Sequence, residues 1–210
     1  MKPLPVALLA ATALLLPAAI PLAGQKVVSV QVGALRTNFW GSDHSHGTIS
    51  GRSMRATLAV PLTGALAIRV DGGYVEKGGA TLGGIYDSHM RLGYAEFSTL
   101  LKASTELGSS ASGHLLVGPA VGVKTRCAIE TTSEGISVEI DCDEAEQNVQ
   151  PTDIGAALGA GIDVAISGGR YRLSFEFLHT MALVSALGDG QHKNSATAFL
   201  LGFGWPIGRE

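Results

Sequence analysis

The sequence is poor in charge and has no long apolar run after its first residues, and each shortage excludes a class of protein. Charged residues make up 16% of the 210 residues and the net charge is −3, which argues against a nucleic-acid-binding protein, because such proteins carry an excess of basic residues. Beyond residue 24, no segment offers the ~20 consecutive apolar residues of a membrane helix. No Ser-His-Asp or Cys-His arrangement emerges either, so we predict no catalytic residue, no cofactor and no enzyme.

Residues 1–24 are the exception to the missing apolar run. Lys2 is followed by an apolar stretch, and the small residues Ala23 and Gly24 precede Gln25. This pattern is typical of a secretory signal peptide cleaved before Gln25. A membrane anchor is the alternative, but two prolines interrupt the stretch. Lipid attachment is not expected, because position 25 is not cysteine. We predict a signal peptide at 1–24 and one domain at 25–210.

What the sequence does contain is glycine, with 28 residues spread along the chain between runs of alternating polarity. Such runs, rich in Val, Leu, Ile and Thr, predict β-strands. Long polar connections follow the odd-numbered runs and short turns follow the even-numbered ones. We therefore predict an all-β fold, an eight-stranded antiparallel up-and-down transmembrane β-barrel with periplasmic N- and C-termini. The expected strands are residues 26–38, 51–61, 65–76, 86–101, 113–126, 152–166, 170–186 and 195–207.

Alternation alone leaves open which face of the strands is inside, because a soluble lipocalin-like barrel turns its apolar face inward. One face here is bulky and apolar, while the other mixes Gly and Ala with charged residues. The second face suits the narrow interior of an eight-stranded barrel. This crowding favours a membrane barrel, and a soluble periplasmic barrel remains the alternative.

The charged inner face predicts a lumen charge network. One interpretation is a polar conduit or a small-ligand site. The other, which we favour, is a plug in which opposite charges pair across an interior that side chains nearly fill. The predicted members are Arg55, Arg69, Asp71, Arg91, Glu96, Lys124, Arg126, Asp153, Asp163, Arg172 and Glu176.

Glu96 interrupts the apolar stretch LGYAEFSTLLK. If Leu92 and Tyr94 face lipid, strict alternation puts this carboxylate in lipid as well, at an unfavourable free energy. A bulge in the strand would shift the parity and turn Glu96 and Ser98 inward. We then expect Glu96 to pair with Arg69 of the preceding strand.

Five ordered strings resemble the successive strands of the PorT-like outer-membrane β-barrel family: LGYAEFSTLLK, GHLLVGPAVGVKTRC, TDIGAALGAGIDV, YRLSFEFLHTMALVSAL and KNSATAFLLGFGW. The resemblance covers roughly residues 86–207 and departs at Ser98, where the family usually has proline. It implies a Gram-negative outer-membrane barrel, and some relatives serve the type IX secretion pathway. The matching positions transfer architecture and not chemistry: Tyr94, Glu96, Leu100, Leu101, Lys102, Gly118, Pro119, Asp153, Gly155, Gly159 and Gly161.

The loops hold the remaining candidates. Cys127 and Cys142 lie in the longest loop, and an exported protein meets an oxidising compartment, so we predict a disulfide. Residues 136–140 of that loop alternate and could form a short hairpin. The loop is also acidic, which fits a solvated surface better than a calcium site. In DHSH, Asp43, His44 and His46 are weak candidates for a transition-metal site.

Taken together, these features predict a monomeric barrel in the outer membrane of a Gram-negative bacterium, with a structural or surface-interaction role. Its partners would be outer-membrane lipid and, through the extracellular loops, envelope or secretion proteins. A narrow pore for small solutes is the alternative function. An enzyme active at the rim is a third, weaker one.

Overall fold

The computed structural model describes residues 25–41, 46–81, 87–133, 136–188 and 191–208, so the predicted signal peptide lies outside the described residues. Within these ranges, no helix is long and apolar enough to cross a membrane. The strands in chain order are β1 (Lys26–Trp40), β2 (His46–Gly47), β3 (Ile49–Pro61), β4 (Leu66–Thr81), β5 (Asp87–Glu106), β6 (Ala111–Ser133), β7 (Ile136–Asp141), β8 (Thr152–Ile166), β9 (Tyr171–Ala182) and β10 (Lys193–Ile207).

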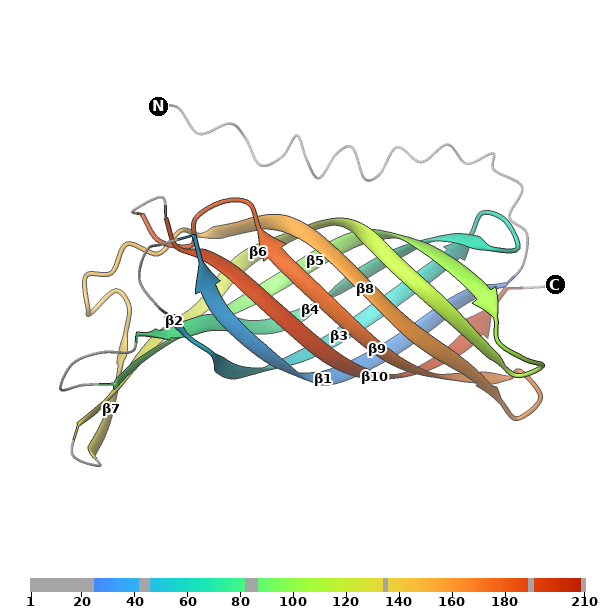
Figure 1. The fold of residues 1–210 in the computed structure, drawn as a ribbon, viewed down its shortest axis with the longest axis horizontal. Helices are drawn as coiled ribbons and strands as arrows, with labels where there is room; N and C mark the ends of the chain where they lie inside the picture. Colours follow the sequence, from blue (N-terminus) through green and yellow to red (C-terminus); the bar gives the residue numbers. More distant parts are fainter. Residues whose placement is uncertain (1–24, 42–45, 82–86, 134–135, 189–190, 209–210) are drawn as a thin grey trace.

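The strands close into a barrel in which neighbouring strands are antiparallel (Figure 1). β1 pairs with both β3 and β10, and β4 pairs with β5, so the order β1-β3-β4-β5-β6-β8-β9-β10 returns to its start. The first and last strands pair from Lys26 opposite Ile207 to Trp40 opposite Lys193. The predicted eight-stranded antiparallel barrel is confirmed in the described residues, where β2 and β7 are additions beyond its wall.

The two rims of the barrel differ in their connections. Short turns at residues 62–65, 107–110 and 167–170 share one rim with both ends of the described chain, and we call it the turn-end rim. The longer connections, including the one that carries β7, define the opposite loop-end rim (Figure 1). In the 167–170 turn, Ser167, Gly168 and Gly169 have φ angles of 52°, 69° and 89°, a region that glycine adopts without steric cost.

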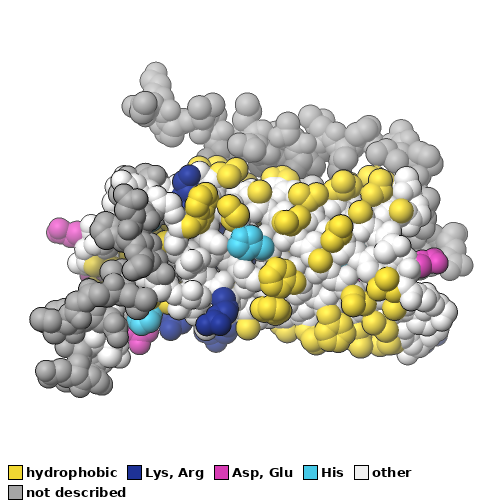
Figure 2. All heavy atoms as spheres, in the orientation of Figure 1, with side chains coloured by type: hydrophobic (Ala, Val, Ile, Leu, Met, Phe, Trp, Pro, Cys, Tyr) yellow, Lys and Arg dark blue, Asp and Glu magenta, His cyan; other side chains and the backbone are white. Residues whose placement is uncertain are grey.

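Side chains on the two faces of the wall differ as the period of two requires. The outward positions are apolar and exposed, for example Met54, Phe97, Leu115, Leu158 and Phe199. On the face drawn in Figure 2, hydrophobic side chains are spread over the barrel wall. The inward positions carry the buried polar side chains Gln31, Arg55, Arg69, Asp71, Glu96, His114, Asp153, Asp163 and Glu176. A soluble barrel with its apolar face inside is therefore the wrong alternative.

The structure corrects the predicted bulge. β5 alternates without interruption, and Leu92, Tyr94, Glu96 and Ser98 are all buried on its inner face. Glu96 does turn inward, but the expectation that Leu92 and Tyr94 face lipid is wrong.

The register shift lies on the neighbouring strand β6. Gly93 pairs with Arg126 and Tyr94 pairs with Lys124, so Thr125 is the extra residue. Its hydroxyl donates a hydrogen bond to the Gly93 carbonyl at 3.1 Å. The parity of β6 changes there, which exposes Arg126 and buries Cys127.

Several strands run further toward the loop-end rim than the alternation predicted. β4 continues to Thr81 and β6 to Ser133, whereas their predicted ends were residues 76 and 126. The predicted hairpin is confirmed: β7 pairs with the end of β6, from Ala128 opposite Asp141 to Ser133 opposite Ile136. β4, β5, β6 and β7 together form a sheet that projects beyond the wall at this rim (Figure 1).

Candidate functional site in the barrel interior and at the loop-end rim

The interior nearer the loop-end rim holds four paired charges, which we call the loop-side cluster: Arg55, Lys77, Glu96 and Asp153. Arg55 lies 2.8 Å from one oxygen of Glu96, and Lys77 lies 2.5 Å from the other. Lys77 also lies 2.9 Å from Asp153. Two cations and two carboxylates balance one another, and their side chains are at most 5% exposed.

Two neutral side chains complete this cluster. Asn194 donates from Nδ2 to the Tyr94 hydroxyl at 3.2 Å and to Asp153 at 3.3 Å. Lys77 Nζ also lies 5.7 Å from the centre of the Tyr94 ring, a cation–π contact. The cluster therefore joins β3, β4, β5, β8 and β10 through side chains alone.

A second group, the turn-side cluster, lies nearer the other rim: Arg69, Asp71, Lys102, His114, Asp163 and Glu176. Arg69 donates to both oxygens of Asp71 at 2.8 Å and to Glu176 at 2.6 Å. β4 and β9 stand on opposite sides of the barrel in the strand order, so the contact between Arg69 and Glu176 crosses the lumen.

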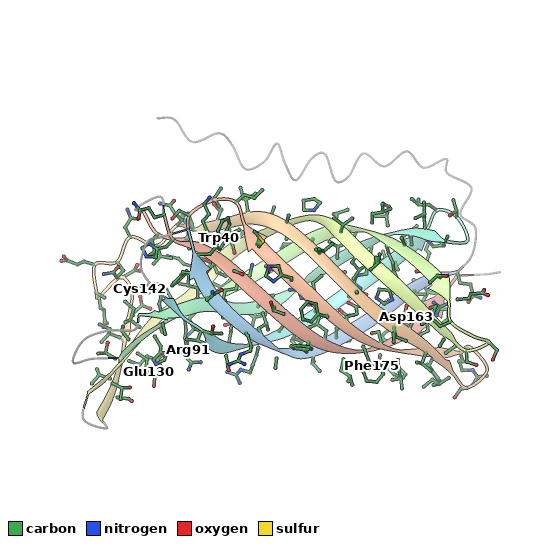
Figure 3. All side chains as sticks on the ribbon, viewed as in Figure 1. Trp40, Arg91, Glu130, Cys142, Asp163 and Phe175 are labelled. Carbon is green, nitrogen blue, oxygen red and sulfur yellow. A yellow bond between two sulfur atoms is a disulfide. The ribbon has the colours of Figure 1, made fainter. Side chains whose placement is uncertain are left out.

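The other half of the turn-side cluster is centred on a histidine. Lys102 lies 2.6 Å from Asp163, and His114 lies 3.4 Å from Asp163 and 3.4 Å from Glu176. Figure 3 places Asp163 toward the turn-end rim and Phe175 on the barrel wall. Among the described residues, His114, Asp163 and Glu176 form the group whose donor atoms lie close enough together for a metal ion. Each of the two carboxylates already has a cationic partner, Lys102 for Asp163 and Arg69 for Glu176, so this arrangement fits a set of buried ion pairs better than a metal site.

Apolar side chains fill the interior at the loop-end rim, and we call them the apolar cap. Tyr94 and Leu92 are fully buried there, and the partly buried Met90, Ile129 and Leu187 pack against the cap. The remaining members are Phe39, Cys127, Cys142, Val149 and Ala186. Further along the lumen, a second buried layer includes Leu35, Val75, Leu100, Leu116, Leu178 and Leu200.

The predicted disulfide is confirmed and belongs to the apolar cap. Cys127 of β6 bonds to Cys142, which directly follows β7, and their Cα atoms lie 5.5 Å apart. Cys142 is fully buried. The bond therefore fastens the open end of the β6–β7 hairpin to the inner wall of the barrel.

The turn-end rim is hollow by contrast. A cavity of about 370 Å³ opens there, and the chain segment at Gln25 and the 62–65 turn contribute to its walls. Arg69, Lys102, Asp163 and Glu176 of the turn-side cluster form part of its lining. Arg172, a predicted lumen residue, also lines this cavity and is exposed.

Other predicted lumen residues lie elsewhere. The prediction that Arg91 points into the lumen is wrong. Its side chain is 49% exposed and lies 3.6 Å from Glu130, near the loop-end rim (Figure 3). Arg126 is exposed and pairs with Glu139 of β7 at 2.7 Å, because of the bulge at Thr125. Lys124 points inward but donates to the Val149 carbonyl at 3.1 Å.

The predicted pairing of Glu96 with Arg69 is wrong. In the register of β4 and β5, Glu96 lies opposite Gly73, whereas Arg69 lies opposite Leu100, further along the sheet. Arg69 reaches across the lumen to Glu176 instead.

Sequence reasoning missed Lys77, Lys102 and Asn194. Lys77 and Lys102 were assigned to connections because their strands were predicted to end at residues 76 and 101, whereas β4 and β5 continue to Thr81 and Glu106. Both occupy inward positions, at i+2 from Val75 and Leu100, and alternation over longer strands could have found them.

The weak metal candidates cannot be placed. Asp43 and His44 lie outside the described residues, and of His46 only the backbone, in β2, is described.

No protein-family model matches this sequence, and no curated protein matches it. Solved structures do match. Neisserial surface protein A aligns over 87% of this chain and 97% of its own, with a TM-score of 0.53 and 12% identity. The outer membrane protein OprG of Pseudomonas aeruginosa aligns over 89% and 97%, with a TM-score of 0.53 and 12% identity. At such identity the likeness shows the fold alone, that of the eight-stranded outer-membrane barrels. The PorT-like resemblance stays a prediction.

Proposed function

We propose that this protein is a non-conducting barrel of the outer membrane of a Gram-negative bacterium. It holds the projecting β6–β7 hairpin at the cell surface for interaction with another protein. The apolar outer face of the wall supports the membrane location. Both chain ends then lie in the periplasm, together with the turn-end rim, and outer-membrane lipid surrounds a monomeric barrel.

The observation that carries this proposal is the packing of the interior below the hairpin. Two clusters of buried, mutually paired charges and an apolar cap occupy the lumen. An interior filled in this way supports the wall and leaves no open path for solutes along the lumen. The disulfide in the cap fastens the hairpin to this rigid base. A rigid base with a fixed projection is the arrangement that a surface-interaction protein needs.

Topology can be tested on intact cells. An epitope inserted between Glu144 and Ala145, in the exposed turn after β7, is expected to bind antibody on unbroken cells. The matched control carries the same epitope between Gly108 and Ser109, in the β5–β6 turn, and binds antibody only after the outer membrane is permeabilised. The proposal is overturned if only the 108/109 epitope binds antibody on intact cells. It is also overturned if both variants fold but neither epitope binds antibody on permeabilised cells.

A narrow pore is the second candidate function, and the cavity at the turn-end rim favours it. Single-channel recording in a planar bilayer separates the two. We expect the refolded protein to be silent, because paired charges cross the lumen. Reproducible conductance steps that change when Lys77→Met is introduced would establish the pore instead. Membership in a secretion assembly, which the PorT-like resemblance suggests, belongs to the same proposal and depends on the identity of the partner.

A further inference from the structure

β7 has one edge without a strand partner among the described residues. It pairs with β6 along a single edge, over residues 136–141, and lies off the closed path of the barrel. β8 pairs with the same edge of β6 nearer the turn-end rim, from Ala111 opposite Val164 to Val123 opposite Thr152. β7 thus takes over from β8 beyond the barrel wall (Figure 1), and its other edge carries backbone N–H and C=O groups free for another chain.

The two faces of β7 differ in chemistry. Val138 and Ile140 share one face and are 55% and 38% exposed. They lie opposite Thr131 and Ile129 of β6, and Ile129 packs against the apolar cap, so this face continues the inner wall of the barrel. The other face presents the exposed carboxylates of Glu139 and Asp141.

The charge around this edge has one sign. Asp143, Glu144 and Glu146 follow directly, and the sequence has neither Lys nor Arg between Cys127 and Gln150. Among the residues that the structure describes, the cation paired with β7 is Arg126, whose contact with Glu139 is exposed on both sides, at 60% and 52%, and is therefore weak. A strand that adds to this edge meets excess negative charge on one face and apolar side chains on the other.

From these observations we propose that the free edge of β7 binds an extended segment of a partner protein in which basic and apolar side chains alternate. Backbone hydrogen bonds give the segment its alignment along the edge. Its apolar side chains lie beside Val138 and Ile140, and its basic side chains lie beside Glu139 and Asp141. This is strand addition with specificity from alternate side chains. The inference rests on the proposed function and names the class of partner.

A second copy of this chain is a poorer occupant. Antiparallel pairing of two β7 strands places Glu139 and Asp141 of one copy against the same carboxylates of the other. Like charges directly opposite one another destabilise a strand pair.

The test uses the refolded mature protein in detergent micelles with its disulfide formed. The probe is a fluorescent peptide of alternating Lys and Val, and binding is followed by anisotropy. One comparison peptide has the same composition in two blocks, and another is N-methylated so that it cannot donate backbone hydrogen bonds. The alternating peptide is expected to bind at least about tenfold more tightly than either comparison peptide.

Two matched variants locate the site. Glu139→Lys with Asp141→Lys is expected to weaken binding about tenfold or more. Glu144→Lys with Glu146→Lys makes the same change of charge in the turn, off the strand, and is expected to weaken binding clearly less than the first variant does. The proposal is overturned if the block peptide binds as well as the alternating one, or if both variants lose the same affinity. Either result indicates electrostatic adhesion alone.

Failure of this inference and failure of the proposed function give different results. Peptide binding in micelles does not depend on which side of a membrane the hairpin faces, whereas the epitope experiment measures only that. If the hairpin is exposed on the cell surface but binds none of the peptides, the proposed docking edge is rejected and the proposed surface role is not. Concentration-dependent dimers of the purified protein, lost with Glu139→Lys and Asp141→Lys, identify a second copy as the occupant and reject the basic segment.

Discussion

At the scale of the residue, Glu96 shows how a charge is accommodated inside this barrel. Its two carboxylate oxygens each contact a different cation, Arg55 and Lys77, and all three side chains are nearly inaccessible to solvent. Taking ions out of water costs free energy that only good geometry offsets. The cluster is therefore more sensitive to the loss of one partner than to the loss of a neutral neighbour.

Glu96→Gln is expected to lower the free energy of unfolding by about 3 kcal/mol, because it leaves buried cations without full compensation. Urea unfolding of the protein in lipid vesicles measures the change. Glu106→Gln, near the exposed end of the same strand, is the control and should behave as the parent does. Equal stabilities for both variants contradict the assignment of Glu96 to a buried pair.

Gly118 on β6 is a second sensitive residue. A Cβ at this position would lie 2.1 Å from the Thr99 carbonyl oxygen of β5, so the two strands would have to separate. Gly118→Ala is expected to destabilise the barrel by about 1–3 kcal/mol. Gly64→Ala, in a turn where no atom lies within 4 Å of the added methyl group, should have no such effect. Thermal unfolding followed by the change in gel mobility compares the two.

At the scale of the element, the β6–β7 hairpin differs from the other strands in what holds it. The wall strands pair along both edges, whereas β7 pairs along one and depends on the disulfide behind it. The hairpin is therefore the part whose order can be lost without unfolding the barrel.

Replacing Cys127 and Cys142 with serine together is expected to free the hairpin while the barrel stays closed. Protease should then cut within residues 128–150 and leave a folded core, whereas the oxidised parent resists. The chain-entropy model assigns on the order of 3 kcal/mol to a loop of this size. Unchanged protease resistance of the double variant would show that packing alone orders the hairpin.

At the scale of the whole molecule, the outer face of the barrel suits an apolar solvent, and side chains fill most of the interior. Exposed side chains such as Leu158 and Phe97 face outward, while the charges are inside and paired. The loss of stability caused by a charged substitution on the outer face should therefore depend on how deep the substituted position lies in the bilayer, which is not expected for a water-soluble barrel.

Leu158→Arg, in the middle of β8, is expected to lower the stability of the protein in vesicles by about 2–4 kcal/mol. Leu107→Arg, in the β5–β6 turn, is the matched control, with a cost of about 0–1 kcal/mol at the interface. Both leucines are exposed, at 62% and 58%, so burial inside the protein does not distinguish them. A similar cost at both positions argues against a membrane around the wall.

The sequence by itself determined the fold class and the disulfide, which depend on local information: the period of two, the alternation of turns and loops, and the count of cysteines. The inward direction of Glu96 was predicted for a wrong reason, because the bulge that was to turn it inward is absent from β5. The extra length of β4 and β6 was harder to predict, because residues 77–81 (KGGAT) and 127–133 (CAIETTS) do not alternate regularly between apolar and polar side chains.

Only the tertiary structure decided which charges meet. The bulge at Thr125 reverses the parity of β6, and the stagger between β4 and β5 separates Arg69 from Glu96. Arg69 then finds Glu176 across the lumen, on a strand 107 residues away. Partners of this kind depend on barrel closure and on register. Both are properties of the assembled sheet, which the pattern of a single strand does not contain.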